Sequence, residues 1–152
     1  GEQGPTLYGS TENTGLFCGH DDVPPTGSIA GLFRIDASDG RLGERTAVVT
    51  DFAQFGDGVT IDVDGNVYVN FIFAQGFDLA RSTTWVLPAG DSELIELLRV
   101  DHRVMANLAF APEAYGNGML YIAILAVPPF TDLSTRGLLR VDLGLDGLPL
   151  LP

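Results

Sequence analysis

The most promising chemical group in the sequence is the carboxylate of Asp57, which stands between Gly56 and Gly58. A carboxylate is a hard oxygen donor of the kind that binds divalent cations. Glycine has no Cβ, so the backbone on either side of Asp57 can come close to a ligand. The same arrangement is also typical of a carboxylate that caps a glycine-rich turn, and the neighbouring residues do not decide between the two.

The stretch that contains Asp57 predicts two strands joined by a tight turn. Apolar and polar residues alternate from Val59 to Val63, which is the period of a half-buried strand, and the alternation resumes from Val67 to Phe71. Between the two runs, Asp64-Gly65 or Gly65-Asn66 supplies the positive-φ residues that a two-residue hairpin turn requires. We therefore expect Asp57 just before the first strand begins.

A threefold repeat runs through the chain. An aliphatic residue followed by tyrosine occurs three times, as Leu7-Tyr8, Val67-Tyr68 and Leu120-Tyr121. A second strand follows each pair, with the sequences GLFRID at 31–36, TTWVLP at 83–88 and GLLRVD at 137–142. A third strand is expected at 45–50, 93–99 and, in truncated form, 148–151, and inner strands are expected at 58–62 and 107–111. The mild helical pattern at 93–99 is outweighed by its place in the repeat.

Four antiparallel strands repeated about every 50 residues are typical of β-propeller blades. We predict an all-β fold, a single partial propeller over 1–152, with an incomplete blade at 1–50 and blades at 51–100 and 101–152. Three blades do not close a ring, because propellers have about four to eight, and open edges invite pairing. We therefore expect either a longer polypeptide, consistent with a chain that begins at Gly1 without methionine, or assembly of several chains.

Propeller topology places Asp57 on the same face as several predicted loops. These loops hold both histidines and several acidic and aromatic residues, which could line a small-molecule pocket. The candidates are His20, Asp21, Asp22, Phe73, Phe77, His102 and Phe130. Simpler roles remain open: the charged residues could be solvated loop polarity, and the phenylalanines could cover blade faces.

The composition excludes several classes of function. Twenty acids stand against eight arginines and no lysine, a net charge of −12, which disfavours binding to a phosphate backbone. The lone cysteine excludes an internal disulfide, and no run is long enough to span a membrane. No nucleophile elbow or phosphate-binding loop occurs. An EF-hand beginning at Asp62 fails because Phe73 takes the place of its final glutamate.

Four segments carry a resemblance to a known family. They are the run from GLFRID at 31–36 through DGV at 57–59 to GNVYV at 65–69, then ANLAF at 106–110, GMLYI at 118–122 and RGLLRVDLGLDGLP at 136–149. In this order they resemble the carboxy-terminal half of the SMP-30/gluconolactonase family of six-bladed propellers. Gly56 departs from the proline usual there, and Ala111-Pro112-Glu113 from a double glycine.

The resemblance implies a metal-dependent hydrolase. Members of that family bind one divalent metal, commonly calcium, at the mouth of the channel and hydrolyse lactones. Asp57 is then expected to be a metal ligand and a candidate for the base that activates water, whereas Asn107 falls in a segment with a structural role. The remaining ligands of the family belong to earlier blades, so a second propeller half is an expected partner.

Two other functions remain open on the sequence alone. One is a non-catalytic propeller module that binds a ligand or helps to build an assembly, which suits a chain that lacks the other expected ligands. The other is a propeller similar to strictosidine synthase, which shares the blade pattern. No targeting segment is evident, so the sequence assigns the chain to no compartment.

Overall fold

The computed structural model describes residues 6–10, 30–38, 41–53, 55–75, 78–101, 103–112, 118–125 and 136–147. These residues form strands and contain no helix. The strands are β1 (Thr6–Ser10), β2 (Ala30–Ser38), β3 (Arg41–Ala53), β4 (Phe55–Ile61), β5 (Val67–Gln75), β6 (Asp78–Leu87), β7 (Ile95–Asp101), β8 (Val104–Phe110), β9 (Met119–Leu125) and β10 (Gly137–Asp142). The predicted all-β class is confirmed.

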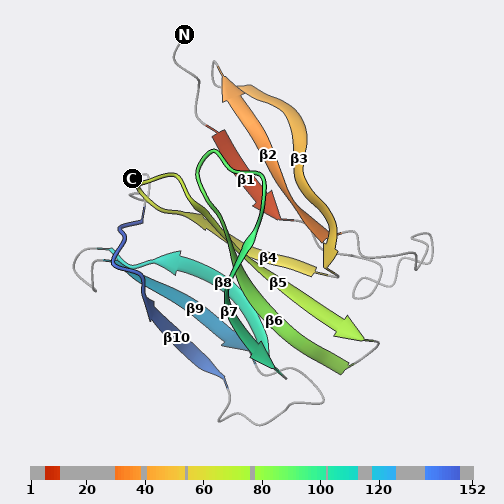
Figure 1. Ribbon diagram of the computed structural model, residues 1–152, viewed down its shortest axis with the longest axis vertical. Coiled ribbons are helices and arrows are strands. Elements are labelled where there is room, and N and C mark those ends of the chain that lie inside the picture. Colours follow the sequence, from red (N-terminus) through yellow and green to blue (C-terminus); the bar gives the residue numbers. More distant parts are fainter. Residues whose placement is uncertain are drawn as a thin grey trace.

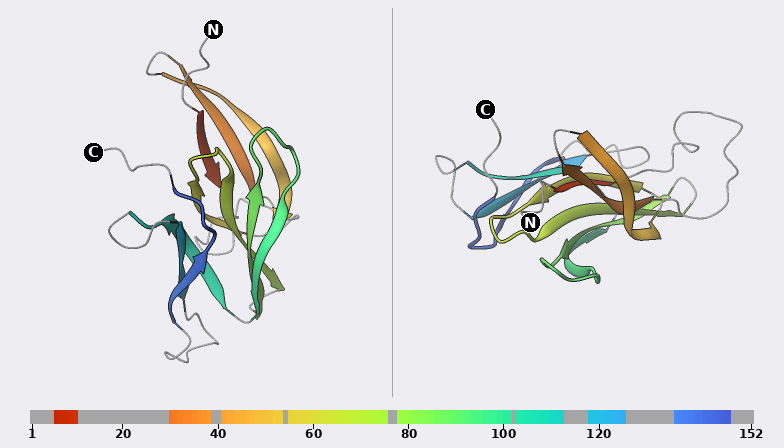
Figure 2. Two further views of the ribbon diagram at one scale, coloured as in Figure 1. Left: turned by 60° about the vertical axis from the view of Figure 1, so that its left-hand side comes forward. Right: turned by 90° about the horizontal axis from the view of Figure 1, so that it is seen from above.

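The strands make three antiparallel sheets. The first sheet has the order β1-β2-β3, the second β4-β5-β6-β7 and the third β10-β9-β8. Figure 1 shows the first sheet at the top, the third at the lower left and the second between them, and Figure 2 gives two further views. Neighbouring sheets are consecutive in the chain, an arrangement compatible with part of a propeller.

Strand pairing follows the sequence repeat. The residue after each repeated tyrosine pairs with the matching residue of the next strand: Gly9 with Phe33, Val69 with Trp85, and Ile122 with Leu139. The strand predicted at 93–99 is also confirmed, as β7, and it begins two residues later and ends two residues later than expected. The strand predicted at 148–151 lies outside the described residues.

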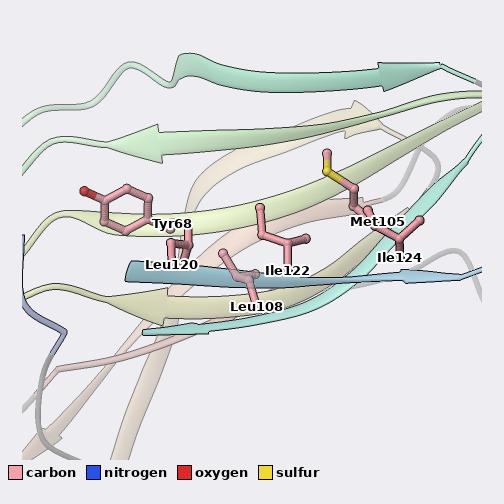
Figure 3. Close-up of a cluster of buried hydrophobic side chains, with 6 residues drawn as sticks. All are labelled: Tyr68, Met105, Leu108, Leu120, Ile122 and Ile124. Atoms are coloured by element: carbon pink, nitrogen blue, oxygen red, sulfur yellow. The ribbon is translucent and has the colours of Figure 1, made fainter. Parts of the chain in front are cut away.

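The middle sheet packs against a core cluster on each of its two faces. Between the first and second sheets lies a first core cluster, made of Leu32, Val67, Val69, Phe71 and Leu87, and Trp85 packs against it. Between the second and third sheets lies a second core cluster, made of Tyr68, Met105, Leu108, Leu120, Ile122 and Ile124. Figure 3 shows these six side chains gathered between β5, β8 and β9. The alternation of strand residues places neighbours along β5 in different clusters.

The hairpin between β4 and β5 differs from the prediction. The backbone N–H of Asp62 donates to the carbonyl of Asn66 at 3.1 Å, so three residues form the turn, and the predicted two-residue turn is wrong. Gly65 has the expected positive φ of 86°. A three-residue hairpin loop with a left-handed glycine is a common alternative to the two-residue form.

The position of Asp57 also differs from the prediction. Strand β4 begins at Phe55, so Asp57 lies inside the strand and not before it.

No helix in the described part of the chain is long and apolar enough to cross a membrane.

Candidate functional site

A hollow of about 530 Å³ lies where the three sheets approach one another. Strand β1 contributes Gly9 and Ser10 to its lining, β4 contributes residues 56–59, and β8 contributes Asn107. Among these described lining residues, Asp57 is the one with an ionisable side chain. Because the three strands belong to three different sheets, the hollow depends on the docking of all three.

A β-bulge places Asp57 at the hollow. Gly56 pairs with Phe71 and Val59 with Val69, so Asp57 and Gly58 together stand opposite the single residue Asn70. An extra residue of this kind bends a strand and turns a side chain away from the regular alternation. Asp57, which is half-buried, thereby lies at the lining of the hollow, and Val59 resumes the regular ladder.

A second bulge, in β8, places Asn107. Met105 pairs with Ile124 and Leu108 with Ile122, so Ala106 and Asn107 stand opposite one residue of β9. The two bulges meet at Gly58, where an added Cβ would lie 2.7 Å from both the Cα and the Oδ1 of Asn107. A side chain cannot fit there, so the glycine after Asp57 is required by the close approach of β8.

Two hydrogen bonds of the same kind fix these bulges. The Ser10 hydroxyl donates to the Asp57 carbonyl, and the Asn70 amide donates to the Ala106 carbonyl. Ser10 and Asn70 each lie two residues after a repeated tyrosine, so the bonds are equivalent between sheets. Asn70 is fully buried and is itself held by the Thr84 hydroxyl, which donates to its Oδ1 at 2.6 Å.

Each polar side chain at the hollow carries an oxygen atom that can bind a cation. The groups are the Asp57 carboxylate, the Asn107 amide oxygen and the Ser10 hydroxyl, whose lone pairs remain able to accept. This chemistry fits a hard divalent cation in donor type. No group of three or more His, Cys, Asp or Glu side chains able to hold a metal occurs among the described residues. Among the described residues that line the hollow, Asp57 alone is acidic.

A second carboxylate of the hairpin, Asp62, is committed to structure. Its side chain is fully buried and accepts bonds from the backbone N–H groups of Asp64 and Asn66, from the Asn66 amide, and from the Tyr68 hydroxyl at 2.9 Å. Burial, followed by the hydrogen bond to Asp62, raises the pKa of Tyr68 above its ordinary value. The four bonds use both oxygens of Asp62, which explains why a buried charge is tolerated here.

The structure places two of the predicted site residues. Asp57 lines the hollow, whereas Phe73 packs against the first core cluster with the Arg81 guanidinium 4.6 Å from its ring centroid. Phe73 is not among the residues that line the hollow. The other candidates lie outside the described residues: His20, Asp21, Asp22, Phe77, His102 and Phe130.

Two polar side chains of the hollow, Ser10 and Asn107, were not predicted as site residues. Ser10 stands at the repeat position of Asn70, and that equivalence is the one sequence signal that could have pointed to it. Asn107 is brought to Asp57 by the bulge in β8, and a bulge leaves no mark in an alternating apolar pattern. Both depend on contacts between sheets that are distant in sequence.

No protein-family model matches the chain, and neither does any curated protein or solved structure.

Proposed function

We propose that the chain supplies one part of a divalent-cation site in a β-propeller, and that the complete site hydrolyses a lactone or a related ester. The three sheets are then three consecutive blades, the first of them incomplete, of a presumed six-bladed ring. The cation expected from the resemblance to the SMP-30/gluconolactonase family is calcium. A second propeller half, from the same polypeptide or from another chain, completes the ring.

The observation that carries this proposal is the position of Asp57. Asp57 stands in a bulge at the lining of a hollow whose other polar side chains, Ser10 and Asn107, are neutral and carry oxygen atoms. Calcium takes about six to eight oxygen ligands from carboxylates, amides, hydroxyls and water. The hollow offers three such side chains on three different strands, which is the mixture of donors that a partial calcium site needs.

Each residue has a defined task in this proposal. Asp57 holds the cation and accepts a proton from the attacking water, and Asn107 and Ser10 add neutral donors at the same hollow. A bound cation supplies polarisation of the ester carbonyl and a lower pKa for a coordinated water. The bonds from Ser10 and Asn70 to the bulge carbonyls keep the donors in place before a ligand arrives.

Calcium titration of the purified chain by calorimetry tests the cation site. We expect Asp57→Asn to weaken calcium binding by about tenfold or more, because it removes the one charged donor known at the hollow. Glu44→Gln is the matched control: it removes an exposed carboxylate of β3 away from the hollow, and binding should stay within about twofold. Equal calcium affinity in the wild type and in Asp57→Asn would contradict the proposal.

The alternative is a non-catalytic binding or assembly module. It is favoured by the finding that the described residues bring one carboxylate, and no further acidic side chain, to the hollow. Hydrolysis of a panel of lactones and aryl esters separates the two functions. Calcium binding that depends on Asp57, with no turnover even when the chain is assembled with its second half, would favour the module.

A further inference from the structure

The faces of the three sheets repeat in a fixed order. We call the side of a sheet that bears Tyr8, Tyr68 or Tyr121 its tyrosine face, and the side that bears Leu7, Val67 or Leu120 its aliphatic face. Tyr8 and Val67 both pack in the first core cluster, and Tyr68 and Leu120 both belong to the second. Each interface inside the chain therefore joins the tyrosine face of one sheet to the aliphatic face of the next.

One face of each kind has no neighbouring sheet in the described part of the chain. On the aliphatic face of the first sheet, Leu7 is 47% exposed, whereas its equivalents Val67 and Leu120 are 1% and 0% exposed. On the tyrosine face of the third sheet, Leu138 is 64% exposed, whereas its equivalent Leu32 is fully buried. Strand register establishes the second equivalence, because Leu32 pairs with Ser10 and Leu138 with Ala123.

The two open faces match one another by the rule that the internal interfaces follow. Phe33 and Ile35 accompany Leu7 on the aliphatic face of the first sheet, at the positions that Trp85 and Leu87 hold on the second. On the second sheet, Leu87 belongs to the first core cluster and Trp85 packs against it. The chain thus carries both halves of an interface that it already makes twice, and each exposed leucine stands where an equivalent residue is buried.

We propose that the tyrosine face of the third sheet docks onto the aliphatic face of the first sheet of a second copy of this chain. Two such contacts, one at each end, join two copies into a closed ring of six sheets. The contact is heterologous, because it joins two different surfaces. It therefore produces a ring only if the rotation that relates the two copies brings the second contact together as well. Propellers have about four to eight blades, and two copies of three sheets are the one multiple within that range.

This inference rests on the proposed blade architecture but not on cation chemistry at Asp57. The mass of the assembly and the affinity for calcium are separate measurements, so either idea can fail while the other stands. In a closed ring of two copies, the hollow lined by Asp57 in each copy would also face one central space.

Sedimentation of the 152-residue chain over a range of concentrations tests the docking. We expect a dimer of twice the 16.2 kDa chain mass. Leu138→Asp and Leu7→Asp should each raise the dimer dissociation constant by about tenfold or more, because each places a charge in a buried apolar contact. Both leucines are exposed in the isolated chain, so circular dichroism should show unchanged folding.

A matched control and a rescue sharpen the test. Ile95→Asp changes an aliphatic residue that is 53% exposed on the outer strand β7 of the second sheet, and dimerisation should change by no more than about twofold. In the double variant Leu7→Asp with Leu138→Arg, opposite charges lie in the same contact, because the equivalent residues Val67 and Leu32 share the first core cluster, so the dimer should be tighter than in Leu7→Asp alone. A monomer at about 100 μM, or a ladder of open oligomers, overturns the proposal.

Discussion

Asp57 and Asp62 lie on the same hairpin but have different surroundings. Asp62 is fully buried, and four hydrogen bonds use both of its oxygens, so it holds the turn and the start of β5. Asp57 is half-buried and is one of the residues that line the hollow of about 530 Å³. Of two carboxylates five residues apart, one is thus used within the hairpin, and the other lies at the hollow where we propose the cation site.

The Tyr68–Asp62 contact predicts a specific response to alkaline pH. The folded state holds the Tyr68 proton more tightly than the unfolded chain, where tyrosine loses it at about pH 10. Stability from this group is therefore fully present below about pH 10 and is lost as the pH rises further, by at most about 1.4 kcal/mol per pH unit. Tyr68→Phe removes this dependence, and it also removes a buried hydrogen bond worth about 1–2 kcal/mol at neutral pH.

Urea unfolding of the wild type and of Tyr68→Phe, from about pH 8 to about pH 11, measures the effect. The wild type should be more stable at neutral pH, and the difference in unfolding free energy should shrink above about pH 10. Other tyrosines are common to both proteins, so their titration cancels in the difference. A difference that stays constant throughout this range would sink the prediction.

At the residue scale the sequence predicted Asp57 but not its companions. A carboxylate between two glycines is visible in one line of sequence, and the structure does place Asp57 at a hollow. Ser10 and Asn107 reach the same hollow only because β1 and β8 dock beside β4, a contact that local patterns do not encode. The role of Gly58 was likewise seen only in part: its missing side chain makes room for Asn107.

At the scale of elements, strands β4 and β8 of neighbouring sheets approach closely at Gly58. A Cβ at Gly58 would lie 2.7 Å from the Cα of Asn107 and from the backbone nitrogen of Leu108, and backbone atoms cannot turn aside as a flexible side chain can. We expect Gly58→Ala to lower the unfolding free energy by about 1–3 kcal/mol, because overpacking forces the backbone to move.

Gly137→Ala is the control for this substitution. Gly137 begins β10, and an added Cβ there meets nothing within 4 Å, so stability should change by about 0.5 kcal/mol or less. Chemical unfolding of the three proteins gives the comparison. Equal unfolding midpoints and slopes for the two variants would show that β4 and β8 leave room for a methyl group at residue 58.

Strands were predictable because their apolar alternation and the threefold repeat agree, and the repeat correctly outweighed the helical pattern at 93–99, where β7 lies. The length of the β4–β5 turn was not predictable in the same way. The glycine preference of two-residue turns points to Asp64-Gly65 or Gly65-Asn66. The Asp62 carboxylate instead accepts hydrogen bonds from the backbone N–H groups of Asp64 and Asn66, and these local bonds stabilise the three-residue loop.

For the whole molecule, charge opposes compactness. The chain carries a net charge of −12, and like charges on a folded surface repel one another more than they do in an expanded chain. Salt screens this repulsion over a Debye length of about 8–10 Å near physiological ionic strength. We expect the thermal midpoint to rise by a few degrees between about 20 mM and about 300 mM sodium chloride.

Replacing sodium chloride with tetramethylammonium chloride separates screening from specific ion binding. Screening depends on ionic strength, so the two salts should act alike. A midpoint that falls with salt, or that rises with sodium alone, would contradict an origin in overall charge.

The single tryptophan gives the molecule an internal optical reporter. Trp85 packs against the first core cluster, between the first and second sheets, and it takes no part in the second cluster. Indole emission is therefore selective for one of the two internal interfaces. When the first sheet separates from the second, the spectrum changes, whereas separation of the third sheet alone leaves Trp85 in its surroundings. Unfolding followed by fluorescence thus reports on the amino-terminal interface in particular.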